Sequence, residues 1–289
     1  MTEKVFIAII GGSGLYQMTG LQDTKEYNVD TPFGKPSAPI VVGTLENIRV
    51  AFLARHGSGH HLTPSEVPYR ANIYALKSIG VERIISISAC GSLREDYEPG
   101  HIVIPDNIFD NTKGRARSFF GEGMVAHVGV ADPFCNDLSN AVEAAVRSTG
   151  ATTHRGGSFI TIEGPRFSTK AESNVFRAWG MSIIGMTAAP EAFLAREAEL
   201  CYATMAHVTD YDVWHENESP VTVDMIIQTL NKNTQKAQEA IRNLVRGLKA
   251  ERPCECGQAL SSALITDPKV IPAETRNKLN LLVGKYLNN

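Results

Sequence analysis

Short apolar runs, each of strand length, alternate with amphipathic helical segments along most of the chain. The first run, Val5 to Ile10, ends at the glycine-rich turn 11–14. Residues 39–54 predict a hairpin that turns at Glu46-Asn47, so part of the sheet is expected to be antiparallel. Alternation of this kind is typical of folds in which helices cover a sheet. The sequence therefore predicts an α/β layered fold with a mixed sheet.

The later segments continue this alternation. Further strands are expected at 83–88, 101–105, 158–162, 182–186 and 201–208. Helices are expected at 69–80, 137–148, 169–178, 189–199, 222–249 and 274–287. The sequence contains no internal repeat and no low-complexity linker, so we expect residues 1–289 to form a single domain. Within it, about 250–289 forms a C-terminal segment with two cysteines and a helix.

The composition limits the kind of partner. Lysine and arginine total 28 and aspartate and glutamate 31, which gives a formal charge of -3 without a dense basic tract. This charge pattern does not favour nucleic acid or a membrane surface as a partner. Apolar runs stay below the roughly 20 residues that span a bilayer, and the N-terminus lacks a secretory signal pattern. We therefore expect small-molecule ligands and a cytoplasmic location.

The cysteines leave three alternatives open. Their odd number, five in a long chain, does not indicate a secreted disulfide framework. Cys254 and Cys256 form a C-x-C pair, which could hold a metal, form a disulfide or remain two thiols. Four-coordinate zinc requires two further ligands, and the sequence shows no second C-x-C and no histidine pair nearby. Free thiols are therefore favoured over a disulfide, and a disulfide over a metal.

Glycine-rich and polar motifs follow the predicted strands, and ligands of α/β folds bind at the carboxyl ends of strands. The first motif, GGSGLYQMTG, lacks the dinucleotide fingerprint G-x-G-x-x-G because Gln17 occupies the third glycine position. It could be a tight turn or an anion site that uses the Ser13 hydroxyl. The second motif, ARHGSGHH at 54–61, holds one arginine and three histidines. The guanidinium of Arg55 suits phosphate, so an anion-binding loop is favoured over a solvated loop or a metal site.

Three more motifs stand at the same kind of position. They are SACGSLRED at 88–96, TIEGPRFSTKAES at 161–173 and GMTAAPEAFLARE at 185–197. Their small residues allow the backbone to approach a ligand closely, although each could also serve the fold alone. A nucleophilic role for Cys90 is disfavoured, because cysteine is a common buried residue.

The run CYATMAHVTDYDVWHE places Asp210 and Asp212 on either side of Tyr211, directly after eight mostly apolar residues. Paired acids of this kind could be a solvated turn, a metal site or two groups that bind the polar edge of a substrate. The other strand-end motifs, which are rich in groups that bind anions, favour the third alternative.

Seven segments together identify a family. They are GGSGL, YNVDTPFGKPS, LARHG, SACGSLRE, TIEGPRFST, GMTAAPEAFLAREAELCYA and TDYDVWHE. In this order they closely resemble the S-methyl-5'-thioadenosine phosphorylases, which belong to the trimeric purine nucleoside phosphorylases. The resemblance covers about residues 4–245. The segment beyond about 250 is less general to the family, although a C-x-C pair near the end recurs in some prokaryotic members.

The resemblance implies a three-layer α/β/α fold, a homotrimer or a dimer of trimers, and one reaction. Phosphate and methylthioadenosine give adenine and 5-methylthioribose 1-phosphate, without a metal or an organic cofactor. The residues that the resemblance assigns to phosphate are Ser13, Arg55, His56, Ser88, Ala89 and Thr187. Ser13 and Ser88 stand where some members have threonine, so the hydroxyl is retained.

The resemblance also implies the nucleoside site. Met186 is assigned to the ribose face, and His127 to the ribose site of a neighbouring subunit. The residues expected around the purine are Phe167, Ser168, Asp210 and Asp212, and further substrate-binding residues are Cys90, Gly91 and Tyr211. Val223 and His60 are expected to shape the pocket for the methylthio group. Asp210, Asp212 and His56 are the expected catalytic residues.

The reaction explains why carboxyl groups are needed. Cleavage of an N-glycosidic bond leaves negative charge on the base, and adenine leaves well only when its N7 receives a proton or a strong hydrogen bond. A buried carboxyl group beside another acid holds its proton more tightly than usual, so Asp210 is the expected donor. Asp212 is expected to accept from the 6-amino group, which disfavours 6-oxopurines.

Other functions remain as alternatives. A hydrolytic nucleosidase would use the same base site without phosphate and would not need Arg55. A nicotinamide-dependent reductase and a nucleoside-binding regulatory module are less favoured by the motifs. Within the phosphorylases, a methylthioinosine or broader purine nucleoside phosphorylase is the nearest alternative.

Overall fold

The computed structural model describes residues 5–12, 18–215 and 223–287, with side chains described except at 223–233. Within these residues, eleven strands form one sheet. The strands are β1 (Ile7–Gly11), β2 (Gln22–Tyr27), β3 (Ile40–Leu45), β4 (Ile48–Ala54), β5 (Arg83–Ser92), β6 (Ile102–Ile104), β7 (Asn107–Asn111), β8 (Thr153–Arg155), β9 (Ser158–Ile162), β10 (Ile183–Gly185) and β11 (Cys201–Asp210). The helices are α1 (Tyr69–Ser78), α2 (Asn136–Arg147), α3 (Lys170–Ala178), α4 (Ala188–Glu197), α5 (Val223–Gly247) and α6 (Ala273–Leu287), with short 3₁₀ helices η1 (Glu255–Gln258) and η2 (Pro268–Val270).

The sheet is mixed, as predicted. Strands β4, β1, β5 and β11 lie in this order and run parallel. The predicted hairpin joins β3 to β4 in antiparallel pairing, and its turn residues Glu46 and Asn47 have φ values of 50° and 64°. β10 lies antiparallel to the end of β5, next to β9. The parallel centre thus directs several strand ends toward the same edge.

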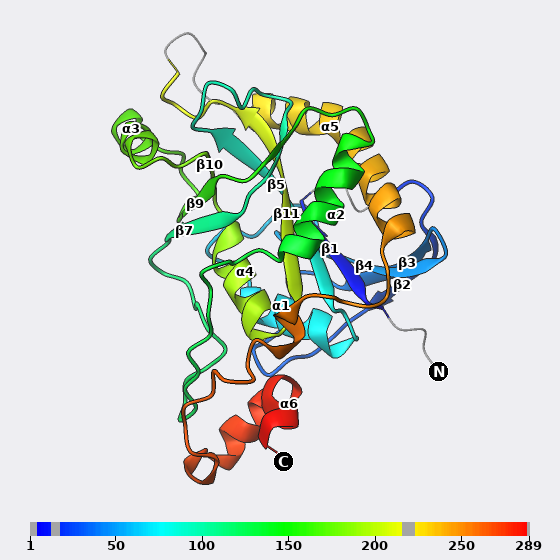
Figure 1. The fold of residues 1–289 in the computed structure, drawn as a ribbon, viewed down its shortest axis with the longest axis vertical. Helices are drawn as coiled ribbons and strands as arrows, with labels where there is room; N and C mark the ends of the chain where they lie inside the picture. Colours follow the sequence, from blue (N-terminus) through cyan, green and yellow to red (C-terminus); the bar gives the residue numbers. More distant parts are fainter. Residues whose placement is uncertain (1–4, 13–17, 216–222, 288–289) are drawn as a thin grey trace.

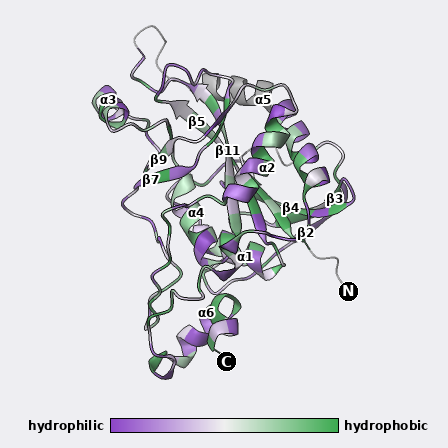
Figure 2. Cartoon of the chain, viewed as in Figure 1, coloured by the Kyte–Doolittle hydropathy of each residue, from purple (hydrophilic) through white to green (hydrophobic). Residues whose placement is uncertain are grey.

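Helices cover both faces of the sheet, which confirms the layered α/β fold (Figure 1). Side chains of β1 alternate between two cores, with Ala8 and Ile10 on one face and Ile7 and Ile9 on the other. The first core includes residues of α1 and α4, and the second includes residues of α2 and α5. Figure 2 shows α2 and α5 with both hydrophobic and hydrophilic residues, as expected for helices with one buried face.

Three strands were not predicted. β2 reads QDTKEY and is almost entirely exposed, so it has no apolar alternation and forms by pairing with β3 at the edge of the sheet. β7 and β8 are likewise short and mostly polar. Backbone pairing with a neighbouring strand, rather than burial, accounts for all three. Among the described helices, none has the length and apolar character needed to cross a bilayer.

Candidate active site

A cavity of about 300 Å³ opens where several strands end. Gly12 follows β1, Arg55 and His56 follow β4, residues 88–91 end β5, and residues 185–187 end or follow β10. The predicted residues that line it are Arg55, His56, His60, Ser88, Ala89, Cys90, Gly91, Phe167, Ser168, Met186, Thr187, Asp210 and Asp212. Residues from six separate predicted motifs are therefore close together in the fold.

Two predicted residues do not line this cavity, and two others lie outside what the structure describes. Tyr211 does not line it; its hydroxyl donates to the Glu95 carbonyl oxygen at 3.3 Å. His127 is exposed and donates its backbone N–H to Ala263. Ser13 lies outside the described residues, as does the side chain of Val223 at the start of α5.

The two acids enter the cavity at an irregularity of β11. Its parallel register with β5 runs as far as Val208 opposite Cys90, and then shifts so that Asp210 lies opposite Gly91. A β-bulge of this kind redirects a side chain at a strand end. Gly91 provides the necessary space, because a Cβ atom there would lie 2.9 Å from Oδ1 of Asp210 and 3.3 Å from Cβ of Asp212.

Burial raises the pKa of Asp210 to about 6, although two hydrogen bonds to its carboxylate oppose this rise. The Thr209 hydroxyl donates to Oδ2 at 2.6 Å, and the backbone N–H of Asp212 donates to Oδ1 at 2.8 Å. The negative charge of Asp212 raises the pKa of Asp210 further. The Asp210 carboxyl group therefore gains a proton more readily than an exposed aspartate.

Asp212 can accept a hydrogen bond from a ligand. Burial raises its pKa, and the hydroxyls of Ser173 and Ser168 partly oppose that rise. These hydroxyls lie close to the carboxylate, but among the described residues neither they nor the buried Oδ2 form a hydrogen bond of standard geometry. A buried carboxylate oxygen without a donor is costly, and a ligand amino group would satisfy it.

Arg55 is held by a buried partner that the motif analysis did not single out. Its Nε and one terminal nitrogen donate to the two carboxylate oxygens of Glu191 at 2.7 and 2.8 Å. The same terminal nitrogen also donates to the Ser86 hydroxyl oxygen, and the other terminal nitrogen donates to the Ile87 carbonyl oxygen. Burial opposes the charge on Arg55, but Glu191 outweighs it and the pKa of Arg55 is raised. Four of the five N–H groups of the guanidinium are thus used, which leaves one available to a ligand.

His56 is a neutral histidine in this cavity. Burial and the positive charge of Arg55 lower its pKa to about 4. Its Nδ1 lies 2.9 Å from the Leu62 carbonyl oxygen, which requires the proton on Nδ1 and leaves Nε2 as an acceptor. The ring stacks on His60 with 4.3 Å between centroids.

Sequence reasoning also missed a buried arginine that joins two loops of the cavity. One terminal nitrogen of Arg115 donates to the carbonyl oxygens of Met186 and Ala189 at 2.6 and 2.8 Å. The other donates to the Glu163 carbonyl oxygen at 2.7 Å. Arg115 follows a polar strand that was not predicted, so no strand-end pattern marked it.

His207 is a second lining residue that was missed. It sits within β11, is buried, and neither ring nitrogen has a hydrogen-bond partner among the described residues. Burial lowers its pKa to about 4. Within an apolar strand it resembles a core residue, and only the three-dimensional structure shows that it borders the cavity.

Among the described residues that line the cavity, no group of His, Cys, Asp or Glu side chains has the geometry of a metal site. Within the described part of the chain, the group of His, Cys, Asp or Glu residues with suitable geometry is formed by Cys135, Cys201, Cys254 and Cys256. Cys254 and Cys256 are free thiols in the structure, as predicted, yet they have further possible ligands nearby. Two cysteines distant in sequence supply them, which no spacing rule could indicate.

Comparison with known proteins identifies the family. The sequence profile of the Phosphorylase superfamily matches residues 6–246. An S-methyl-5'-thioadenosine phosphorylase from Geobacter sulfurreducens is 56% identical over 97% of this chain and 99% of its own length. The chain belongs to the S-methyl-5'-thioadenosine phosphorylase family.

Solved structures of this family have the same fold. A methylthioadenosine phosphorylase from an antarctic soil metagenomic library aligns with a TM-score of 0.93 and 49% identity, covering 97% of this chain and 99% of that one. A methylthioadenosine phosphorylase from Schistosoma mansoni, in complex with adenine, aligns with a TM-score of 0.84 and 38% identity, covering 90% and 97%. The resemblance read from the seven segments is thus confirmed.

The buried pair in this phosphorylase yields a stability prediction. Glu191→Gln leaves the buried Arg55 cation without a compensating charge, so we expect the free energy of unfolding to fall by about 3–5 kcal/mol. Asp96→Asn is the matched control, because it removes the partner of Arg94 in a pair whose side chains are 46% and 58% exposed. We expect that control to cost less than about 1 kcal/mol. Urea unfolding at fixed protein concentration measures both; equal losses would contradict the role given to Glu191.

Proposed function

We propose that this chain catalyses phosphorolysis of S-methyl-5'-thioadenosine to adenine and 5-methylthioribose 1-phosphate. The observation that carries the proposal is the buried pair Asp210 and Asp212 in a cavity that also holds Arg55. The relatives support the substrate, since a variant of the Schistosoma mansoni enzyme was solved in complex with methylthioadenosine. That structure is 37% identical and aligns with a TM-score of 0.83.

The proposed phosphate site consists of Ser13, Arg55, His56, Ser88, Ala89 and Thr187. Arg55 contributes its charge and about one N–H, because Glu191 occupies the bidentate edge of the guanidinium. The neutral His56 ring accepts a hydrogen bond from a phosphate O–H group through Nε2. Phosphate held here stabilises positive charge on the ribose and then attacks C1', forming the new C–O bond as the C1'–N9 bond breaks.

The proposed base site is formed by Asp210 and Asp212. The protonated Asp210 carboxyl group donates to N7, so the electron pair of the broken bond is accommodated on a neutral adenine. The unpartnered Oδ2 of Asp212 accepts from the 6-amino group. A 6-oxopurine presents an oxygen at this position. Two acceptors, this oxygen and Oδ2 of Asp212, would then face each other without a proton between them, which disfavours inosine and guanosine.

The remaining predicted residues complete the nucleoside site. We assign Phe167 and Ser168 to the base and Met186 to the ribose, with Cys90, Gly91 and Tyr211 as further substrate-binding residues. His60 and Val223 border the methylthio group. Phosphate is the only co-substrate, no organic cofactor takes part, and the enzyme acts in the cytoplasm in purine and methionine salvage.

We propose a homotrimer, or a dimer of trimers, in which His127 reaches the ribose site of the neighbouring subunit. Two facts support this arrangement. His127 is exposed and stands outside the cavity of its own chain, and the same segment carries Val125 and Val130, which are 46% and 39% exposed. Sedimentation equilibrium measures the mass of the assembly and therefore the number of chains in it.

A substrate panel tests the proposed reaction. Methylthioadenosine, adenosine, methylthioinosine and inosine are each supplied with and without phosphate, and release of the base is measured. We expect release from methylthioadenosine only with phosphate, and kcat/KM for methylthioinosine at least about 10²-fold lower because buried acceptors are left unpaired. Equal release without phosphate would indicate a hydrolase, and equal rates on methylthioinosine would contradict the role of Asp212.

The pH dependence tests the acid role of Asp210. Its protonated form predominates below its pKa of about 6, so kcat/KM is expected to fall as pH rises above that value. The Thr209 hydroxyl stabilises the carboxylate form, so Thr209→Val should raise this pKa and move the falling limb to higher pH by roughly 0.5–1 unit.

Thr209→Ser is the matched control, because it keeps the hydroxyl. Its kcat/KM should fall over the same pH range as that of the wild-type enzyme. Ionisation of phosphate affects all three proteins equally, so the difference between them reports on Asp210. Asp210→Asn should lose most activity and show no such limb. An unchanged limb in Thr209→Val, or full activity in Asp210→Asn, would contradict the assignment.

A further inference from the structure

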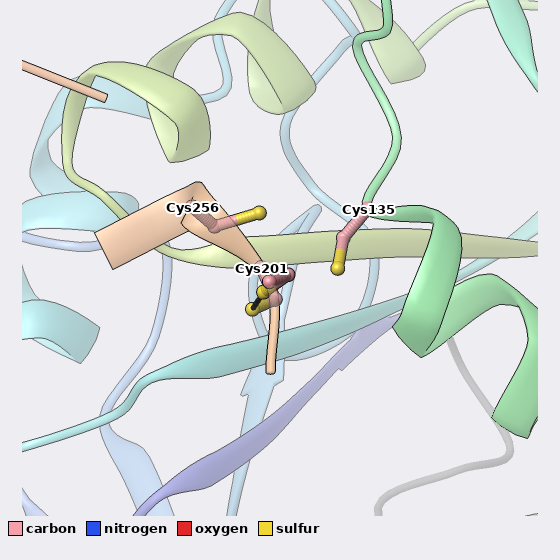
Figure 3. A group of neighbouring side chains, drawn as sticks. Cys135, Cys201 and Cys256 are labelled. Carbon is pink, nitrogen blue, oxygen red and sulfur yellow. Dashed lines mark hydrogen bonds between the residues drawn. The ribbon is translucent and has the colours of Figure 1, made fainter. Parts of the chain in front are cut away.

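Four cysteine side chains converge at a place remote from the cavity. Cys135 immediately precedes α2, Cys201 is the first residue of β11, and Cys254 and Cys256 belong to the segment around η1. All four sulfur atoms lie within 4.8 Å of one another. Figure 3 shows Cys135, Cys201 and Cys256 approaching from different parts of the chain. We propose that these four cysteines bind one Zn²⁺ ion as thiolates.

The spacing of the sulfur atoms fits a tetrahedral ion. Zinc lies about 2.3 Å from each thiolate, which places tetrahedral sulfur atoms about 3.8 Å apart. Sγ of Cys201 and Sγ of Cys254 are 3.3 Å apart, and every other pair lies within 4.8 Å. Four tetrahedral sulfur ligands are typical of zinc, and of iron in iron–sulfur centres, and they disfavour magnesium and calcium, which require oxygen.

The charge of the surroundings also fits. Binding of Zn²⁺ releases the four thiol protons and leaves a centre with a net charge of about −2. Two arginines approach it: a terminal nitrogen of Arg196 lies 3.4 Å from Sγ of Cys256, and one of Arg252 lies 4.0 Å from Sγ of Cys201. Their charges offset that of the centre, and their N–H groups donate to thiolate sulfur, as groups around metal ligands commonly do.

The position indicates a structural role. The family profile ends at residue 246, before Cys254 and Cys256, so the ion would fasten this later segment to the start of β11 and to α2. Asp210 lies at the opposite end of β11, a distance of about 30 Å for a strand of this length. Zinc would therefore stabilise the fold and leave the chemistry of the cavity unchanged. The inference is independent of the proposed reaction.

Metal analysis tests the proposal. One sample is the enzyme purified without chelator, and the other is the same enzyme after incubation with Zn²⁺ and removal of unbound metal. We expect one zinc per chain by mass spectrometry, and its release when a mercurial reagent titrates the thiols. Ellman titration of the denatured protein, with chelator and without reductant, should find all five cysteines as thiols. Only one thiol and no zinc would indicate two disulfides, and five thiols without zinc would indicate an empty cluster; either result overturns the proposal.

Variants and cobalt substitution identify the ligands. Cys256→Ser should lose the zinc and lower the Tm, whereas Cys90→Ser, which removes the cysteine outside the cluster, should retain one zinc per chain. Should Cys256→Ser fail to fold, Co²⁺ in the wild-type protein reports the site directly. Intense visible bands with thiolate-to-metal charge transfer are expected for four sulfur ligands. Weak bands typical of octahedral oxygen coordination, or retention of zinc by a folded Cys256→Ser, would contradict the assignment.

Discussion

The parallel pairing of β5 with β11 supports the candidate site from the middle of the sheet. β5 supplies residues 88–91, and β11 ends at Asp210, so one strand pair brings groups of two predicted subsites to one cavity. The register shift before Asp210 is possible because Gly91 opposite it has no side chain. A Cβ atom at that position would clash with the Asp210 carboxylate and crowd Asp212, so the base site depends on a backbone feature as much as on the carboxylates.

The cation and the two acids of the cavity have different surroundings. Arg55 is fully compensated by Glu191, and Tyr202 also donates to this carboxylate at 2.9 Å. Asp210 and Asp212 instead both follow the bulge, where a hydroxyl and a backbone N–H group donate to Asp210, and burial raises the pKa of both acids. The first arrangement preserves a permanent cation, whereas the second favours the uptake of a proton. Phosphorolysis of an adenine nucleoside needs both kinds of group.

Local signals were sufficient for most of the fold. The apolar run 201–208 and the glycines after β1 made strands and turns predictable, and the motifs after them located most of the cavity lining. Contacts between distant positions were beyond local reasoning. Arg55 and Glu191 are 136 residues apart, and Glu191 looked like an ordinary acid in the first turn of a helix. The cysteine cluster was missed for the same reason, since Cys135 and Cys201 carry no spacing pattern that relates them to Cys254.

The protonation of Asp210 is the central claim, and an infrared titration of the free enzyme measures it directly. Aspartate labelled with ¹³C separates the carboxyl bands from those of glutamate, and the difference between wild-type protein and Asp210→Asn isolates one group. The structure predicts a titration midpoint near pH 6, set by burial and by the neighbouring Asp212. A midpoint near the ordinary aspartate value of 3.8 would contradict it, because the carboxyl group would then be ionised long before neutral pH.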